Sequence, residues 1–382
     1  MDVRTFCTQS HVLVVAGKGG VGKTTMSAAL ARMAADAGLA VLVVELEGRP
    51  GVPGAFGHGG VLDYAGAVLG AAGAVEGEEG SGRGDDPVAV APGTVRARRI
   101  TPDEALLEYL DDHGLRRVSK RLMSAGIIDV VAGAIPGIRD ILVLGKVKQI
   151  ERSGIADLVI VDAPATGHAM TFLSSAAGLL DAARGGPVRT QAAEVVELLT
   201  DPSRCQVALV TLPEEMPVNE AIDAAFALED SVGISLGPVI VNGCYPDVPG
   251  LATPAAEASL TAGVALDREL ATALDRAGAF RRTRQALQGE QIERLGHELP
   301  LAQLRVPFVF STSIGPTELR HLTDALATAV GALPEPDGGT PTGETGRAEA
   351  AGGAGHAEAA GETGRVEAAG GAHPGVAGGP AA

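Results

Sequence analysis

The chain has 382 residues, of which 46% are hydrophobic and only 3% aromatic, with no tryptophan. This hydrophobic share can fill a sizeable core, so we expect a folded chain whose core is built from Ala, Val, Leu and Ile. The formal net charge of −17 repels phosphodiester backbones and anionic lipids. It therefore argues against a nucleic-acid partner.

Three cysteines, Cys7, Cys205 and Cys244, lie far apart, and the sequence has no CxxC or HExxH pattern. It thus indicates neither a disulfide framework nor a zinc site. The N-terminus carries Asp2 and Arg4 and no apolar run, so no signal peptide is predicted. No uninterrupted apolar segment approaches the roughly 20 residues that span a bilayer. We expect a soluble, cytoplasmic protein.

Short aliphatic runs alternate along the chain with longer segments of helical pattern. The runs cover residues 11–16, 40–45, 95–100, 157–162, 206–212, 237–241 and 306–310. Continuous β-branched runs separated by helices are typical of a parallel sheet that is covered on both faces. The sequence therefore predicts an α/β fold with a mostly parallel sheet flanked by helices.

The first run leads directly into the sequence GKGGVGKTT, which matches G-x-x-x-x-G-K-[ST] between a strand and a helix. Such a loop lets backbone N–H groups converge on phosphate oxygens at a helix N-terminus. The predicted nucleotide-binding residues are Gly17, Lys18, Gly19, Gly20, Val21, Gly22, Lys23, Thr24 and Thr25. Lys23 is expected to reach the β and γ phosphates, and the Thr24 hydroxyl to bind Mg²⁺. An accidental glycine-rich turn is the alternative, but the chain has only five lysines and two lie here.

Three segments interrupt or follow this alternation. Residues 66–94 are rich in Gly, Glu and Asp, which predicts a flexible surface loop. Residues 101–152 begin with TPDEALLEYL, a helix start with Pro102 in the first turn, and predict a helical insertion. From residue 334 to 382 the chain has no Leu, Ile or Phe and repeats GETGRAEAAGG as GETGRVEAAGG. We predict a disordered acidic tail after a domain of residues 1–333.

Lys18, directly after the first glycine, gives the loop a distinctive form. KGGVGKTT resembles the deviant Walker A loop of dimerising P-loop ATPases, a group that includes the arsenical pump-driving, tail-anchored-protein targeting, partition and septum-placing ATPases and the nitrogenase iron protein. The resemblance implies ATP and Mg²⁺ as cofactors and a homodimer, or a heterodimer with a related ATPase. It also implies that Lys18 contacts nucleotide phosphate across the dimer interface and acts in catalysis together with Lys23.

Other segments, within residues 11–330, resemble the arsenical pump branch of this group. DAPATGH, residues 162–168, is similar to the DTAPTGH signature with its Thr, Ala and Pro rearranged. Asp162 ends an apolar run, so we expect it to serve Mg²⁺ beside Thr24, with a simple turn or cap role as the alternative. Asn242 in VIVNGCYP resembles an adenine-contacting Asn, and it could equally form a strand-end turn. Residues 308–322 are expected to line the other side of the base pocket.

The segment VVELEGRPGVPGAFG, residues 43–57, resembles the switch I region of the same ATPases. On that register Glu47 occupies the position of the carboxylate that orients the attacking water, which suits in-line attack on the γ phosphate. Glu45, at the strand end, is the rival for a role near Mg²⁺. Glu47 could also be a solvated loop charge.

The function predicted from these features is an Mg²⁺-dependent ATPase of the arsenical pump type that handles an ion or a membrane-protein client. The chain has one Walker A motif, unlike the pump ATPase with its two fused halves, and it lacks the CxxC zinc clip of the targeting ATPases. The alternative is a partition or positioning ATPase, which favours a basic patch or a basic amphipathic terminal helix that the tail lacks. A cluster-bearing reductase is disfavoured by the cysteine spacing.

Overall fold

The computed structural model describes residues 1–46, 51–71, 89–112, 114, 117 and 137–335. The chain divides into two units, Met1–Pro336 and Asp337–Ala382, and the second lies outside the described residues. The predicted disordered tail therefore stays a prediction.

The first unit is built on one eight-stranded sheet. Its strands are β1 (Val12–Gly17), β2 (Val41–Glu45), β3 (Ala67–Ala71), β4 (Thr94–Arg99), β5 (Leu158–Ala165), β6 (Cys205–Thr211), β7 (Val239–Cys244) and β8 (Gln303–Pro307). They lie in the order β3-β4-β2-β5-β1-β6-β7-β8, and every pairing is parallel except β3 with β4. The carboxyl ends of seven strands thus meet at one edge of the sheet.

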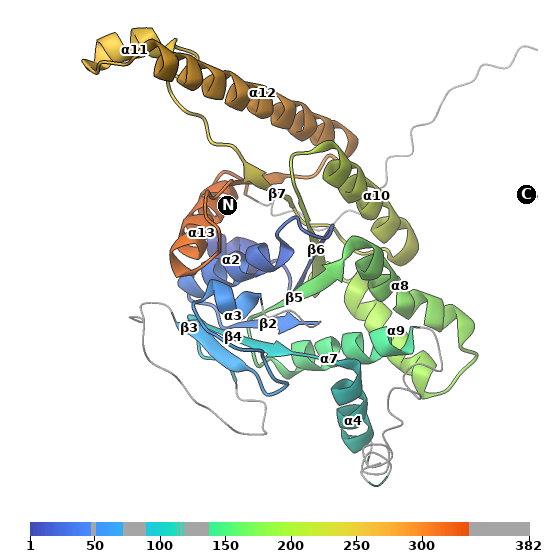
Figure 1. Cartoon of the computed structure of the whole chain (residues 1–382). Coiled ribbons are helices and arrows are strands. Elements are labelled where there is room, and N and C mark those ends of the chain that lie inside the picture. The colour runs from blue at the N-terminus through green and yellow to red at the C-terminus, as the bar shows by residue number, and fades with distance from the viewer. Residues whose placement is uncertain (47–50, 72–88, 113, 115–116, 118–136, 336–382) are drawn as a thin grey trace, which may run out of the picture. The chain divides into compact units, whose positions relative to one another are not determined.

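Helices connect the strands and cover both faces of the sheet. They are α1 (Val3–Cys7), α2 (Lys23–Asp36), α3 (Val52–Ala55), α4 (Pro102–Asp112), α7 (Ile138–Ser153), α8 (Thr166–Ala182), α9 (Pro187–Thr200), α10 (Glu215–Val232), α11 (Ala255–Ala262), α12 (Arg268–Glu298) and α13 (Pro316–Gly331). Figure 1 shows α2 and α13 on one side of the sheet and α7 to α10 on the other.

Alternation along β1 explains why its run of residues is apolar throughout. Val12 and Val14 belong to the core cluster that includes residues of α7 to α10, whereas Leu13 and Val15 belong to the cluster with α2 and α13. Both faces of the strand are therefore buried, as in a doubly covered parallel sheet. The predicted α/β fold with a mostly parallel sheet is confirmed.

Two details differ from the sequence prediction. The predicted 66–94 loop contains a strand, β3, whose pairing partner β4 starts at Thr94, and residues 72–88 lie outside the described residues. The last predicted strand, 306–310, is shifted, because β8 spans Gln303–Pro307. Of the helical insertion, α4 and α7 are described, and most of residues 113–136 are not.

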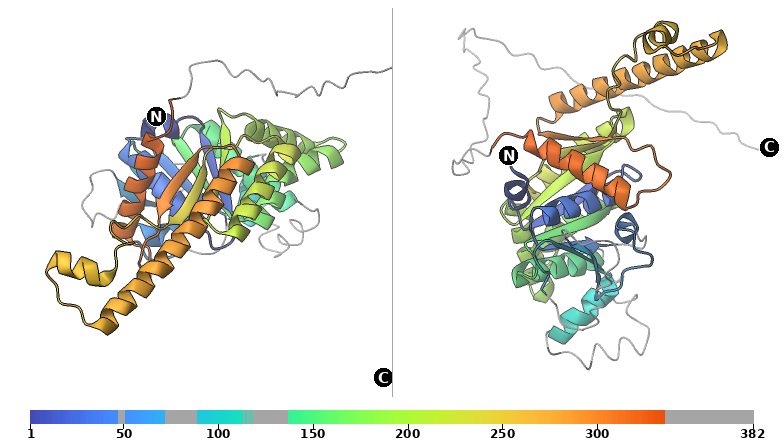
Figure 2. Two further views of the ribbon diagram at one scale, coloured as in Figure 1. Left: turned by 90° about the horizontal axis from the view of Figure 1, so that it is seen from above. Right: turned by 90° about the vertical axis from the view of Figure 1, so that its left-hand side faces the viewer.

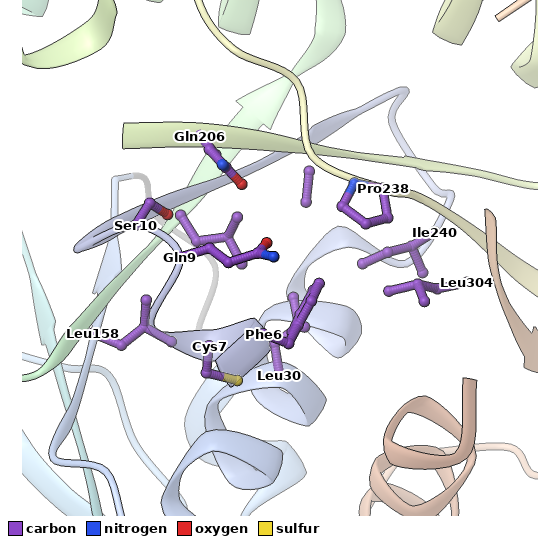
Figure 3. Close-up of a pocket in the computed structure, with 12 residues that line it drawn as sticks. Phe6, Cys7, Gln9, Ser10, Leu30, Leu158, Gln206, Pro238, Ile240 and Leu304 are labelled. Carbon is purple, nitrogen blue, oxygen red and sulfur yellow. The ribbon is translucent and has the colours of Figure 1, made fainter. Parts of the chain in front are cut away.

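A small cavity lies at the amino-terminal edge of the sheet, away from the strand ends that carry the predicted site. Its volume is about 20 Å³, room for roughly one water. Phe6, Cys7, Gln9, Ser10 and Gln206 are among its lining residues, as Figure 3 shows. Burial raises the pKa of the Cys7 thiol to about 12, so this cysteine stays protonated.

Among the described residues, no helix combines the length and apolarity that crossing a bilayer requires.

Candidate nucleotide-binding site

The predicted phosphate loop joins the end of β1 to the start of α2. Gly17 lies so close to β6 that a Cβ at this position would meet the Val210 carbonyl oxygen at 2.2 Å. Gly20 and Gly22 have φ angles of 89° and 92°, in the left-handed region that favours glycine. Gly22 precedes the first residue of α2. Close packing therefore requires glycine at position 17, and backbone conformation favours it at positions 20 and 22.

Asn242, within β7, supports this loop from the side. Its Nδ2 donates a hydrogen bond to the Val21 carbonyl oxygen at 2.9 Å, and a Cβ on Gly22 would lie 2.5 Å from the same nitrogen. The structure therefore brings Asn242 to the phosphate loop. Its predicted contact with adenine stays a prediction.

Lys23, the first residue of α2, folds back over the loop. Its Nζ donates to the Lys18 carbonyl oxygen at 3.0 Å. Burial lowers the pKa of Lys23, and the Asp162 carboxylate partly opposes that shift. A half-buried ammonium at a glycine-rich loop and a helix N-terminus favours a bound anion, such as a phosphate group.

Three side chains from α2 and β5 form an oxygen-rich cluster beside this lysine. The Thr24 hydroxyl donates to one carboxylate oxygen of Asp162 at 2.7 Å, and the Ser27 hydroxyl donates to the other at 3.1 Å. Burial raises the pKa of Asp162, although both hydrogen bonds and Lys23 act in the opposite direction. The fully buried Ser27 was missed by the sequence prediction, although it lies one turn after Thr24 on the same helix face.

This cluster fits the magnesium prediction by its chemistry. Hydroxyl and carboxylate oxygens are the donors that Mg²⁺ prefers, and a nearby cation relieves the cost of keeping Asp162 ionised. One detail corrects the sequence analysis, because β5 continues to Ala165 and Asp162 lies inside the strand rather than at its end.

Glu45 ends β2 beside Asp162, in the adjoining strand. Its carboxylate accepts hydrogen bonds from the backbone N–H groups of Val52, at 3.0 Å, and Gly51, at 3.4 Å. Burial raises the pKa of Glu45, and these two hydrogen bonds lower it. Glu45 therefore fixes the backbone of Gly51 and Val52 beside the end of β2.

Glu47 lies outside the described residues, so its predicted catalytic role stays a prediction. The chain that follows is close to the site, because a Cβ on Gly51 would meet the Thr24 Cγ2 atom at 2.3 Å. Gly19 and Gly20 are exposed at the tip of the loop, and Thr25 is half-buried.

Lys18 has a partner that the sequence did not indicate. Its Nζ forms an ion pair with Glu220 Oε1 on α10, at 2.5 Å, and about a third of each side chain is exposed. This pairing is within one chain, whereas the resemblance implies a phosphate partner across a dimer interface. Glu220 is 202 residues away, so only the fold brings it to the loop.

A strand–loop–helix cradle, a lysine over the loop and a Thr–Asp oxygen pair define a P-loop nucleotide-binding domain. Residues 12–334 match the family model described as CobQ/CobB/MinD/ParA nucleotide binding domain, and the chain belongs to this family. The prediction of a P-loop ATPase related to the arsenical pump group is confirmed by this match together with the relatives below.

Three relatives illustrate the range of similarity. ATPase BagA of Mycobacterium tuberculosis is 34% identical over 240 residues, covering 61% of this chain and 65% of that protein. A putative arsenical pump-driving ATPase of Halobacterium salinarum is 26% identical over 337 residues, covering 82% and 44%. ATPase get3 of Schizosaccharomyces japonicus is 28% identical over 164 residues, covering 42% and 43%. The chain thus spans less than two thirds of each relative.

Proposed function

We propose that this protein is an Mg²⁺-dependent ATPase that works as a dimer and couples ATP hydrolysis to the handling of an ion or a membrane-protein client in the cytoplasm. The observation that carries the proposal is the hydrogen bond between Thr24 and the buried Asp162, directly beside Lys23. The carboxylate of Asp162 and the hydroxyl of Thr24 are oxygen donors of the kind that Mg²⁺ prefers, and they lie together at the phosphate loop.

The loop residues act by position and charge. Backbone N–H groups from Gly17 to Thr24 and the Lys23 ammonium surround the phosphates, which spreads the charge of the transferring phosphoryl group. Thr24 and Asp162 would hold Mg²⁺. The metal, when bound, neutralises charge that develops on the β and γ phosphate oxygens.

Two further residues complete the proposed reaction. Lys18 leaves Glu220 and contacts the nucleotide phosphates of the second subunit, so turnover needs a dimer. Glu47 orients the attacking water. The position of Gly51 against Thr24 supports the second role, because it holds the chain that follows residues 47–50 at the metal site.

The client is proposed from the relatives. One of them is named as a putative arsenical pump-driving ATPase, and another is the ATPase get3. The first of these names refers to an ATPase that drives a pump, which favours an ion or a membrane-protein client for this chain. A partition or positioning ATPase is the second candidate at the level of the family, and dependence of turnover on DNA or lipid vesicles would favour it.

The test compares two matched substitutions, one inside β5 and one at the residue that precedes this strand. Asp162→Asn removes the proposed metal ligand, whereas Asp157→Asn makes the same change where the carboxylate accepts the Ala40 N–H at 2.8 Å. We expect phosphate release to fall at least about tenfold in Asp162→Asn only, a barrier increase of roughly 1.4 kcal/mol. If the wild type hydrolyses ATP and both variants release phosphate at the same rate, Asp162 has no part in the reaction.

A further inference from the structure

A long helical arm extends from the sheet and has little contact with it. We define the arm as residues 255–289, which comprise α11 and the first 22 residues of α12. Helix α12 has 31 residues, a length of about 46 Å, yet only Gly278, Gln288 and Leu295 are buried. Figures 1 and 2 show the arm extending away from the other helices.

One face of the arm has the spacing of a helix-pairing seam. Ala273, Phe280 and Leu287 follow one another at intervals of seven residues, and Arg276 and Thr283 lie between them at the alternating spacing of three and four. All five are exposed, Phe280 to 68% and Leu287 to 46%. Only Ala273, Phe280 and Leu287 are apolar, so the face has one apolar residue in every seven, with Arg276 and Thr283 between them. Exposed apolar side chains at this spacing can pack against a second helix, whereas a lone exposed helix gains little from them.

The charges of the arm are separated along its length. Its tip, residues 255–275, has four acidic side chains, Glu257, Asp267, Glu269 and Asp275, against Arg268 alone. Its stem, residues 276–289, has four arginines, at positions 276, 281, 282 and 284, and no acidic residue.

These stem arginines are only partly neutralised within the chain. Among the described residues, Arg284 forms an ion pair with Glu214, whereas Arg281 and Arg282 donate to the backbone carbonyl oxygens of Pro246 and Leu251. A carbonyl oxygen accepts a hydrogen bond but leaves the positive charge in place. The stem is thus a basic surface on a chain with a net charge of −17.

We propose that the arm is a dimerisation surface whose partner is the arm of a second copy of this chain, in antiparallel orientation. Antiparallel pairing places each acidic tip against the basic stem of the other copy, and places the exposed Phe280 and Leu287 in the contact. Parallel pairing would bring tip to tip and stem to stem, which like charges oppose. A two-fold axis between the arms makes both contacts identical.

The stem is continuous with the carboxyl edge of the sheet that carries the nucleotide site. Arg281 lies over the rings of Tyr245, at 5.1 Å, and Phe310, at 5.6 Å. Tyr245 follows Asn242 by three residues, and Gln288 of α12 bonds to the backbone of both Gly243 and Tyr245. The arm is therefore fixed to the same edge of the sheet as Asn242, and the proposed arm contact deepens the proposed dimeric function and rests on it.

The test exchanges charge between tip and stem in the full-length chain. A tip variant carries Glu257→Lys and Glu269→Lys, and a stem variant carries Arg276→Glu and Arg282→Glu. By sedimentation equilibrium with MgATP, we expect each variant alone to dimerise roughly tenfold or more weakly than the wild type. We expect an equimolar mixture of the two to dimerise more tightly than either variant alone, because one of its two contacts then joins an unaltered acidic tip to an unaltered basic stem.

The control carries the same charge change away from the arm. Arg4→Glu and Arg184→Glu match the stem pair, because Arg4 also donates to a carbonyl oxygen and Arg184 is exposed. We expect this control to dimerise like the wild type. A monomeric wild type, tip and stem variants that dimerise like the wild type, or a mixture that dimerises no more tightly than either variant alone would overturn the arm contact. Calorimetry measures MgATP binding by every variant. The ATPase proposal predicts that all of them bind MgATP like the wild type, so a failure of the arm contact with intact binding leaves the ATPase proposal standing.

Discussion

Substitution of Gly22 by alanine tests how the phosphate loop and Asn242 support each other. Gly22 needs a left-handed conformation, with φ at 92°, and a Cβ there would lie 2.5 Å from Asn242 Nδ2. That nitrogen already donates to the Val21 carbonyl oxygen. Gly22→Ala therefore strains the backbone and also displaces the amide that holds the loop.

The two costs can be separated with Gly20. Gly20 has a similar φ of 89°, but a Cβ there has no neighbouring atom within 4 Å. Gly20→Ala therefore carries only the conformational cost, about 1–2 kcal/mol. Gly22→Ala adds the lost hydrogen bond, roughly 0.5–1.5 kcal/mol. We expect Gly22→Ala to lower the free energy of unfolding by about 1 kcal/mol more than Gly20→Ala does.

Urea denaturation of the nucleotide-free protein, followed by circular dichroism, measures this difference. Asn242→Ala supplies the third corner of a double-mutant cycle, because it removes both the clash and the hydrogen bond. The cost of Gly22→Ala combined with Asn242→Ala should then fall below the sum of the single costs by about 1 kcal/mol. Equal costs for Gly20→Ala and Gly22→Ala, or strict additivity in the cycle, would refute this account of the loop.

Three further outcomes are expected. Lys18→Ala should bind MgATP in calorimetry like the wild type but lose most turnover, and normal turnover by a strictly monomeric protein would contradict this. Asp162→Asn should raise the unfolding temperature of the metal-free protein at pH 7. Burial raises the pKa of Asp162 above 3.8, so the ionised carboxylate is disfavoured in the fold, and the advantage should vanish as the pH falls towards 4. Deletion of residues 334–382 should leave melting and hydrolysis unchanged, since the tail lacks large apolar side chains, and a much lower melting temperature would disprove it.

The parts of the site that the sequence predicted depend on local pattern. The strand, the phosphate loop and α2 are continuous in the chain, so residue types at fixed spacing are enough to place Gly17 to Thr24. Asp162 was placed by the resemblance of DAPATGH to the DTAPTGH signature and by its position after an apolar run. Only its position inside β5, rather than at the strand end, needed the structure.

The parts that the sequence did not predict depend on pairing between distant segments. β3 lies in a glycine-rich stretch and becomes a strand only because it can pair with the edge of β4. Pairing with β7 starts β8 at Gln303, three residues before the apolar run 306–310 from which the strand was predicted. Burial of the Ser27 hydroxyl against Asp162 likewise depends on how α2 packs on β5. A single sequence holds no signal for contacts of this kind beyond general periodicity.

The pairing of Lys18 with Glu220 shows why the fold matters for the proposed cycle. An ion pair between side chains that are one third exposed contributes only about 0.2–1 kcal/mol. It is strong enough to give the Lys18 ammonium a preferred position in a single chain. It is also weak enough to break when a polyphosphate, with several negative charges, approaches from a second subunit. Breaking the pair therefore costs little, so the same lysine can serve both arrangements of the proposed cycle.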